Sequence, residues 1–417
     1  MKTKALRLYG ANDVRLEEFD LPEITEEELL IKVVSDSVCL STYKAIKQGG
    51  EHKRVPNDVD KNPIIVGHEM CCEIAEVGEK LKDKWKVGQK VVIQPALKLE
   101  NNHDIGYSYP FIGGNTKYAV VSKLVLDRGC VLPYNGDSFF AGSLTEAFGC
   151  IIRGYKGMYH TDYTNYERFD GAKKGGKIAI LGGAGPMGIG TIDLGCGYAG
   201  ASQIVVTDLS QERLDFANSV LSTEYAKAKG VDLRYVNTSG IENVGAYLKE
   251  ISGGGFDDVF VMVPVPALFT LAEEICKFDG CINFFAGPTN HELMGSLNLY
   301  RVHYDGIHVV GTAGSIPQDM VDAITLIEQN KLKPGALVSH ILGLNSASDA
   351  LFAMATPNGA KKVCYNHLDL PLIAISELGE LGKTNPLYKK LDEIVKANDG
   401  LWCAEAEEYL LANAPKL

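Results

Sequence analysis

The chain has 417 residues, of which 46% are hydrophobic and 23% charged, and its formal net charge is −12. These values suit a globular protein with two cores; they exclude a disordered chain and offer no basic face for nucleic acid. The sequence contains no run of about 18 uncharged apolar residues, which a membrane-spanning helix would need. Residues 1–19 lack the apolar stretch of a signal peptide. The ten cysteines are scattered rather than arranged as a disulfide framework. We therefore expect a cytoplasmic protein with neither a membrane nor a nucleic-acid partner.

The first 150 residues are rich in short apolar or alternating runs that are separated by glycine-containing turns. Such runs are typical of β-strands, and they cover Leu29–Val34, Cys71–Val77, Lys90–Ile93 and Tyr118–Val121. A small, irregular β-barrel is the structure that this pattern favours.

From about residue 175, apolar runs alternate with stretches long enough for helices, and Gln211–Lys229 is the clearest of these helices. The predicted strands are Lys177–Leu181, Gln203–Thr207, Leu233–Val236, Asp257–Val263, Cys281–Ala286 and Ile307–Gly311. This alternation predicts a parallel sheet of the α/β class. Six strands suit a doubly wound, Rossmann-type dinucleotide-binding domain.

Beyond about residue 315, we expect the chain to return to the first domain. Two charged, helix-prone segments, Leu387–Lys396 and Ala404–Ala412, predict a helical extension at the C-terminus. The expected division therefore assigns residues 1–155 and 315–417 to the β-rich domain. Residues 156–314 form the dinucleotide-binding domain.

A glycine-rich loop follows the predicted strand KIAIL directly and opens a helical stretch. Gly183, Gly185 and Gly188 fit the pattern G-x-G-x-x-G, and Pro186 and Met187 lie between the last two. The glycines would permit a tight turn, a close approach to a pyrophosphate and close packing of helix on strand, while the helix N-terminus would supply N–H donors. A glycine-rich turn without function is the alternative.

Asp208 ends the next predicted strand, twenty residues after the last glycine of the loop. A carboxylate at this position can accept the adenosine ribose hydroxyls and would repel a 2′-phosphate, so NAD is favoured over NADP. Asp208 could instead cap the following helix, a role for which Ser210 competes. Arg213, one turn further on, either contacts the same ribose or is a solvated helix residue.

Three residues of the first domain could together hold a catalytic zinc ion. Such an ion takes three protein ligands among thiolate, imidazole and carboxylate and leaves a fourth position open. Cys39, His68 and Glu146 supply one of each type, but they are far apart in the sequence. Taken singly, each has a plain alternative as a core thiol, a turn residue or a charge at a helix N-terminus.

These segments resemble the zinc-containing medium-chain dehydrogenases, near their sorbitol dehydrogenase branch. Cys39-Leu40-Ser41 matches the start of the family's C-x-[ST]-D, and Gly67-His68-Glu69 matches its G-H-E. Glu146 matches the glutamate that the polyol branch carries in place of a third cysteine, and the loop GAGPMG is almost identical to the family's. The resemblance covers roughly residues 1–365.

The resemblance implies a GroES-like catalytic domain, a Rossmann domain and one catalytic zinc held by Cys39, His68 and Glu146. It also implies an oxidoreductase that transfers a hydride between a nicotinamide cofactor and a polyol or the matching ketose. Ser41 would pass the alcohol proton towards solvent, unless it is only a turn serine. Neighbouring side chains on an extended segment point to opposite sides, so Glu69 is expected to be an outer-sphere residue or an alternate ligand that exchanges with Glu146 or water.

Two departures from the family pattern affect the expected metal site. Thr42 stands where the family has Asp, so a usual outer hydrogen bond is expected to be lost. Many family members also hold a second, structural zinc with four cysteines, but no cysteine lies between Gln94 and Gly114. One zinc per chain is therefore expected.

The segment after Cys39 is basic, since Lys44, Lys47, Lys53 and Arg54 oppose the single carboxylate of Glu51. The run CLSTYK and the chain length are similar to those of L-sorbose 1-phosphate reductases, which interconvert L-sorbose 1-phosphate and D-glucitol 6-phosphate. Lys44 and Arg54 are thus candidates to bind a substrate phosphate, with a solvated basic face as the alternative. The wider resemblance also implies a homodimer or homotetramer.

Two other functions are compatible with parts of this pattern. The zinc-free quinone reductases of the same superfamily keep the glycine loop but lack the cysteine and glutamate ligands. A catalytically inactive NAD-binding protein is the second alternative, and the intact Cys39, His68 and Glu146 argue against it.

Overall fold

The computed structural model describes residues 1–355 and 359–417, and the chain folds into two compact units. Unit 1 contains residues 1–146, 316–328 and 334–417, and unit 2 contains residues 147–315 and 329–333. The sequence-based division placed the first boundary at residue 155. In the structure the boundary follows Glu146, because most of the helix Thr145–Gly157 packs within unit 2.

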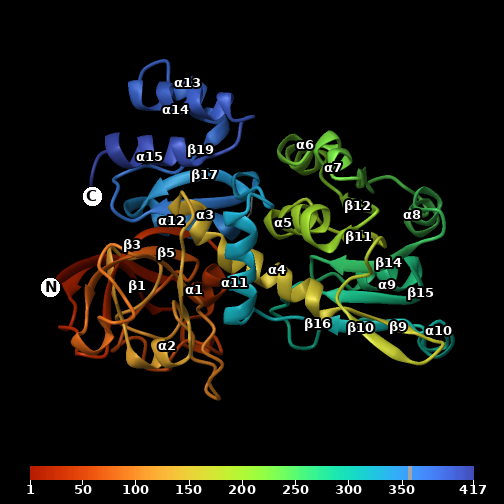
Figure 1. Ribbon diagram of the computed structural model, residues 1–417, viewed down its shortest axis with the longest axis horizontal. Helices are drawn as coiled ribbons and strands as arrows, with labels where there is room; N and C mark the ends of the chain where they lie inside the picture. Colours follow the sequence, from red (N-terminus) through yellow and green to blue (C-terminus); the bar gives the residue numbers. More distant parts are fainter. Residues whose placement is uncertain (356–358) are drawn as a thin grey trace. The chain divides into compact units, whose positions relative to one another are not determined.

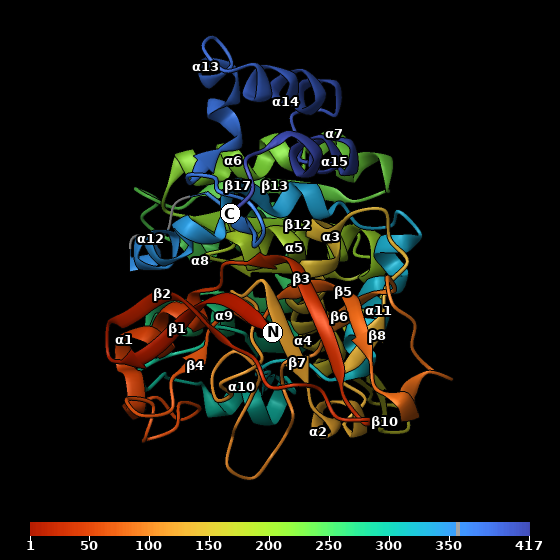
Figure 2. The ribbon, with the colours of Figure 1, turned by 90° about the vertical axis from the view of Figure 1, so that its left-hand side faces the viewer.

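Unit 1 is built on a mixed sheet in the order β19-β17-β18-β3-β5-β6-β8, with β7 pairing on β3. The strands are β3 Leu29–Ser37, β5 Met70–Val77, β6 Lys90–Ile93, β7 Tyr118–Val121, β8 Val131–Pro133, β17 Val338–Gly343, β18 Lys361–Tyr365 and β19 Ile373–Ala374. Strands β3, β5, β6 and β8 lie side by side in Figure 2. The four strands predicted for this part of the chain are confirmed.

A smaller sheet in unit 1 has the order β2-β1-β4, formed by β1 Lys2–Gly10, β2 Asp13–Asp20 and β4 Ile64–Ile65. The unit's helices are α1 Leu40–Gln48, α2 Lys123–Asp127, α3 Phe139–Ser143, α11 Pro317–Glu328, α12 Ala347–Phe352, α13 Leu378–Leu381, α14 Pro386–Ala397 and α15 Ala404–Asn413. Helices α14 and α15 confirm the two helices predicted for the C-terminal extension, and they lie close together with α13 (Figure 1).

Unit 2 contains a six-stranded parallel sheet in the order β13-β12-β11-β14-β15-β16. Its strands are β11 Lys177–Leu181, β12 Gln203–Asp208, β13 Asp232–Asn237, β14 Phe256–Val261, β15 Cys276–Phe284 and β16 His308–Gly311. Numbered along the chain, this order is 3-2-1-4-5-6, the order of a Rossmann fold. The predicted doubly wound sheet is therefore confirmed. Of its two central strands, β14 is wholly buried and β11 is buried except at Lys177, because helices cover both faces.

The helices of unit 2 are α4 Thr145–Gly157, α5 Pro186–Leu194, α6 Gln211–Val220, α7 Thr223–Ala228, α8 Val244–Ser252, α9 Pro266–Ile275 and α10 Leu299–Tyr304. The single helix predicted for Gln211–Lys229 is wrong, because the structure divides it into α6 and α7. Ser222 causes the break: its hydroxyl accepts a hydrogen bond from the Tyr225 N–H at 3.1 Å and so begins a new helix.

A hairpin that the sequence did not predict separates α4 from the Rossmann sheet. It consists of β9 Tyr159–Asp162 and β10 Glu167–Asp170. Strand β10 is exposed along its whole length, so it lacks the apolar alternation by which strands are found. Within the described residues, no helix is long and apolar enough to cross a membrane.

Candidate active site

The pairing of β3 with β5 brings the first predicted ligand next to the second. Asp36 pairs with Met70 in this antiparallel ladder, so the residues that follow β3 lie opposite those that precede β5. Cys39 is the N-cap of α1, and His68 and Glu69 lie immediately before β5. One ligand atom each of Cys39, His68 and Glu69 lie within 4.8 Å of one another. Residues remote in the sequence thus form one cluster.

Gly67 is required by the backbone that presents His68. Its φ is +89°, and a Cβ there would lie 2.7 Å from Asp36 Oδ2. The buried Asp36 carboxylate accepts a hydrogen bond from the Glu69 N–H at 2.9 Å and another from Asn115 Nδ2 at 2.8 Å. Asp36 therefore fixes the segment that carries both His68 and Glu69.

Thr42 orients the imidazole of His68. Its hydroxyl lies 3.1 Å from His68 Nδ1, and both side chains are buried. When Nδ1 donates its proton to Thr42, Nε2 keeps its lone pair for a cation. The expected loss of an outer hydrogen bond at Thr42 is therefore wrong, because the threonine hydroxyl itself reaches the His68 ring.

Glu69 forms a buried ion pair with Lys361, a residue that the sequence did not indicate. Lys361 Nζ lies 2.5 Å and 2.6 Å from the two carboxylate oxygens, and the Ser37 hydroxyl donates to the same carboxylate. Burial opposes ionisation, but the charges of Lys361 and His68 and these hydrogen bonds hold the pKa of Glu69 below its usual value. Glu69 is thus an ionised carboxylate within the ligand cluster.

Glu146 lies at the N-terminus of α4 and is largely buried. It falls outside the group of three atoms within 4.8 Å, yet its charge reaches both other ligands: it adds to the burial that raises the pKa of Cys39, and it opposes the burial that lowers the pKa of His68. The structure therefore gathers Cys39, His68 and Glu69 most closely and places Glu146 near them. Ligation by Glu146 rather than Glu69 stays a prediction.

Ser41 and Tyr107 form a chain of hydroxyl groups beside the cluster. The Tyr107 hydroxyl donates to Ser41 Oγ at 2.8 Å and lies 3.3 Å from His68 Nε2. Ser41 Oγ is 3.0 Å from Cys39 Sγ. Burial raises the pKa of Tyr107 well above its usual value, so the phenol stays protonated. The sequence offers no signal for Tyr107, which comes from the long loop between β6 and β7.

The cluster fits a zinc ion by its chemistry. Burial raises the pKa of Cys39 to about 11, so a thiolate at neutral pH requires a cation beside it. A thiol, an imidazole and a carboxylate within 4.8 Å form the mixed donor set that zinc accepts. Cys39, His68 and one carboxylate can therefore hold the ion and leave one position open.

The glycine loop of unit 2 fits a dinucleotide. A Cβ on Gly183 would lie 2.5 Å from the Ile180 side chain, and one on Gly188 would lie 1.9 Å from the Gly183 carbonyl, so both positions exclude other residues. Apart from its chain neighbours, no described residue has an atom within 4 Å of a Cβ built on Gly185, which leaves room for a phosphate at the start of α5.

The remaining predicted cofactor residues lie around this loop. Pro186 and Met187 occupy the first turn of α5, and Asp208 ends β12. Ser210, not Asp208, caps α6, because its hydroxyl accepts from the Arg213 N–H at 3.3 Å. The Arg213 side chain is exposed.

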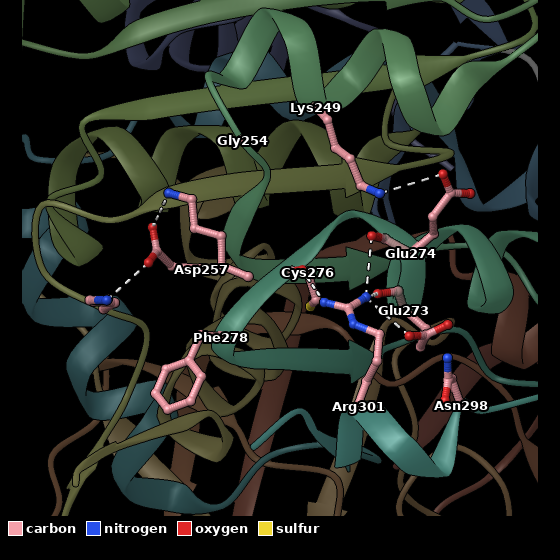
Figure 3. A pocket seen from close by; sticks show the side chains of 11 residues that line it. Lys249, Gly254, Asp257, Glu273, Glu274, Cys276, Phe278, Asn298 and Arg301 are labelled. Carbon is pink, nitrogen blue, oxygen red and sulfur yellow. Dashed lines mark hydrogen bonds and ion pairs between the residues drawn. The ribbon is translucent and has the colours of Figure 1, made fainter. Parts of the chain in front are cut away.

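A pocket of about 880 Å³ lies elsewhere in unit 2 (Figure 3). It adjoins Asp257 and Lys277, at the amino ends of β14 and β15, whereas the glycine loop follows the carboxyl end of the parallel strand β11. Its charged side chains pair with one another, as Arg301 with Glu273 at 3.0 Å and Lys277 with Asp257 at 3.3 Å. It is therefore not part of the dinucleotide site.

A thiol–imidazole–carboxylate cluster and a Rossmann glycine loop define the chain as a metal-dependent oxidoreductase of the dinucleotide-linked class. Comparison with known proteins narrows this class. Residues 25–128 match the alcohol dehydrogenase GroES-like domain, and residues 186–329 match the zinc-binding dehydrogenase family. The chain belongs to the zinc-binding medium-chain dehydrogenases, in their polyol dehydrogenase branch, so the resemblance found in the sequence is confirmed.

Two enzymes are among the relatives that match over nearly the whole chain. A mannitol-1-phosphate 5-dehydrogenase of Aliivibrio fischeri is 43% identical, over 98% of this chain and 97% of its own length. An L-sorbose 1-phosphate reductase of Klebsiella pneumoniae is 40% identical, over 99% and 98%. The fold also matches the crystal structure of 2R,3R-butanediol dehydrogenase from Bacillus subtilis, with a TM-score of 0.71 at 21% identity, over 87% of this chain and 99% of that chain.

Proposed function

We propose that the enzyme oxidises a polyol phosphate at a secondary alcohol, or reduces the matching ketose phosphate, with a nicotinamide cofactor. The pair L-sorbose 1-phosphate and D-glucitol 6-phosphate is one candidate, and D-mannitol 1-phosphate is another. The observation that carries the proposal is the cluster of Cys39, His68 and Glu69 within 4.8 Å. The names of two relatives that match over nearly the whole chain, a mannitol-1-phosphate 5-dehydrogenase and an L-sorbose 1-phosphate reductase, support the substrate class.

The chain's own residues would position the substrate and move a proton. Zinc, when bound, would act as a Lewis acid on the substrate oxygen, and the nicotinamide would carry the hydride. Ser41 Oγ lies beside Cys39 and can accept the alcohol proton as its own hydroxyl proton passes on towards solvent, and the Tyr107 hydroxyl, which donates to Ser41 Oγ at 2.8 Å, holds Ser41 in place. A rotating hydroxyl both accepts and donates, so Ser41 can take up one proton as it releases another and stays uncharged.

We propose NAD as the preferred cofactor. Asp208 ends the second strand of the Rossmann sheet, and its Oδ1 accepts a hydrogen bond from the Ser210 N–H at 3.1 Å. This bond holds the carboxylate at the strand end, where it would bind ribose hydroxyls and repel a 2′-phosphate.

We also propose that the enzyme assembles as a homodimer or homotetramer. In the described part of the sheet, β16 is an edge strand that pairs with β15 alone. The preceding helix α10 exposes Leu299, Tyr300 and Tyr304, and exposed apolar side chains beside a free strand edge favour association. Sedimentation equilibrium that gave a mass of one chain would contradict this proposal.

The function is tested by steady-state assays of purified enzyme with D-mannitol 1-phosphate, D-glucitol 6-phosphate and the unphosphorylated polyols, each with NAD and with NADP. We expect turnover of a polyol phosphate with NAD, and its loss after treatment with a chelator. Addition of zinc should restore the activity. Absence of turnover in every combination, in either direction, would refute the proposal.

A further inference from the structure

Arg54 is held in a fixed position by contacts at both of its ends. Its Nε lies 2.8 Å from Asp104 Oδ2, and its carbonyl accepts a hydrogen bond from the Ser108 hydroxyl at 2.6 Å. Asp104 is itself fixed, because its Oδ1 accepts from the Leu97 N–H at 2.9 Å and its own N–H donates to Ser108. A guanidinium fixed in this way loses little side-chain entropy when it binds an anion.

The guanidinium of Arg54 lies next to the hydroxyl chain of the active site. Its central carbon is 5.1 Å from the centroid of the Tyr107 ring, whose hydroxyl contacts Ser41 at 2.8 Å. A single aromatic ring thus separates the guanidinium from the group proposed to accept the substrate proton. Within residues 1–355 and 359–417, the two terminal nitrogens of Arg54 make no hydrogen bond, so their planar fork is available to a phosphate.

Other cations add to the positive charge at this place. Lys44 lies on α1, partly buried, and interacts electrostatically with Cys39; burial lowers its pKa. His52 stacks on Tyr107 with ring centroids 5.9 Å apart, and its pKa is lowered to about 4 by burial and by the charges of Arg54, Lys53 and Lys44. His52 is therefore neutral at pH 7, and the carboxylate in direct contact with Arg54 is that of Asp104.

We propose that Arg54, assisted by Lys44, binds the phosphate of the phosphorylated polyol and so sets the enzyme's preference for phosphorylated substrates. This inference rests on the proposed function and assigns its anion-binding residues. Lys47 and Lys53 of the same segment are exposed, and we do not assign them to this site. Arg54 is bound to Asp104 through Nε, which leaves its terminal nitrogens to contact the phosphate side by side.

The test compares Arg54→Gln and Arg54→Lys with a matched control, Lys47→Gln, which removes an exposed cation from the same segment. The readout is the ratio of kcat/KM for D-mannitol 1-phosphate to that for D-mannitol, and the same ratio for D-glucitol 6-phosphate and D-glucitol. Arg54→Gln should lower this ratio by about 10- to 100-fold, as expected for lost hydrogen bonds to a charged group, and mainly through KM. Arg54→Lys should retain part of the ratio, and Lys47→Gln should change it by less than about twofold.

A second readout uses inorganic phosphate as an inhibitor that competes with the phosphorylated substrate. Its inhibition constant should rise in Arg54→Gln by a factor similar to the loss in kcat/KM, and stay unchanged in Lys47→Gln. If wild type turns over polyol phosphates while Arg54→Gln keeps the wild-type ratio and inhibition constant, the phosphate site is wrong and the function stands. If wild type turns over no polyol or polyol phosphate, both proposals fail.

Discussion

The hydrogen bond between Thr42 and His68 shows how one outer residue can decide the strength of a metal site. The imidazole offers a lone pair at Nε2 only when its proton sits on Nδ1, and the Thr42 hydroxyl 3.1 Å from Nδ1 favours that arrangement. Threonine supplies this contact without the negative charge of an aspartate. The charge in the cluster therefore comes from Cys39 and the nearby carboxylates.

Replacing Thr42 by valine keeps the shape of the side chain but removes this hydrogen bond. We expect zinc affinity to fall by about 10- to 100-fold, as for other outer-sphere partners of ligating histidines. The measurement is the zinc dissociation constant from competition with a chromophoric chelator. Thr42→Ser, which keeps the hydroxyl, serves as the control and should bind zinc nearly as wild type does; equal affinity in Thr42→Val would show that the contact is irrelevant.

Among the elements, the C-terminal extension has a structural role that its sequence does not reveal. Glu407 of α15 is buried, and its two oxygens accept hydrogen bonds from the N–H groups of Phe139 and Phe140, at 2.5 Å and 2.7 Å. These are the first N–H groups of α3, which have no partner inside the helix. The Tyr365 hydroxyl also donates to Glu407, at 2.9 Å. The extension thus caps α3, which is followed directly by the helix that carries Glu146.

The Glu407 cap makes stability depend on pH. Burial, partly offset by these hydrogen bonds, raises the pKa of Glu407 to about 7 from a usual value of 4.5. Because the folded pKa is raised, its favourable contribution is complete below about pH 4.5 and is lost as pH rises through 7, by roughly 3 kcal/mol at most. In Glu407→Gln, the free energy of unfolding should fall less between pH 5 and pH 8 than in wild type. Denaturant titrations that gave the same pH slope for both proteins would contradict this assignment.

The elements that the sequence predicts well are those whose burial follows a simple pattern. The six predicted Rossmann strands and the four strands predicted for unit 1 are apolar runs, and the structure contains all ten. Strand β18 is missed because it begins with Lys361 and Lys362, both buried, where a central strand should be apolar. Lys361 is tolerated there only because Glu69 neutralises it, and a partner so remote in sequence leaves no local signal.

The dinucleotide site and the metal site differ in how much of each can be predicted from the sequence. The dinucleotide loop is one contiguous segment, so its glycines, strand and helix can be recognised together. The metal cluster is assembled by sheet pairing, with Asp36 opposite Met70 and Ser37 opposite Val363. From the sequence, only the family resemblance indicates that these ligands belong to one site. Tyr107 and Lys361 were missed because they reach the site through tertiary contacts alone.

The proposed chemistry requires a zinc ion held by Cys39, His68 and a carboxylate, and elemental analysis of purified, active enzyme can detect that ion. We expect one zinc per chain in wild type. In Cys39→Ala, we expect both zinc and turnover to be lost while NADH still binds, because its site lies in the other unit. Fully active enzyme without stoichiometric metal, or a Cys39→Ala variant with wild-type turnover, would contradict a catalytic zinc at this site.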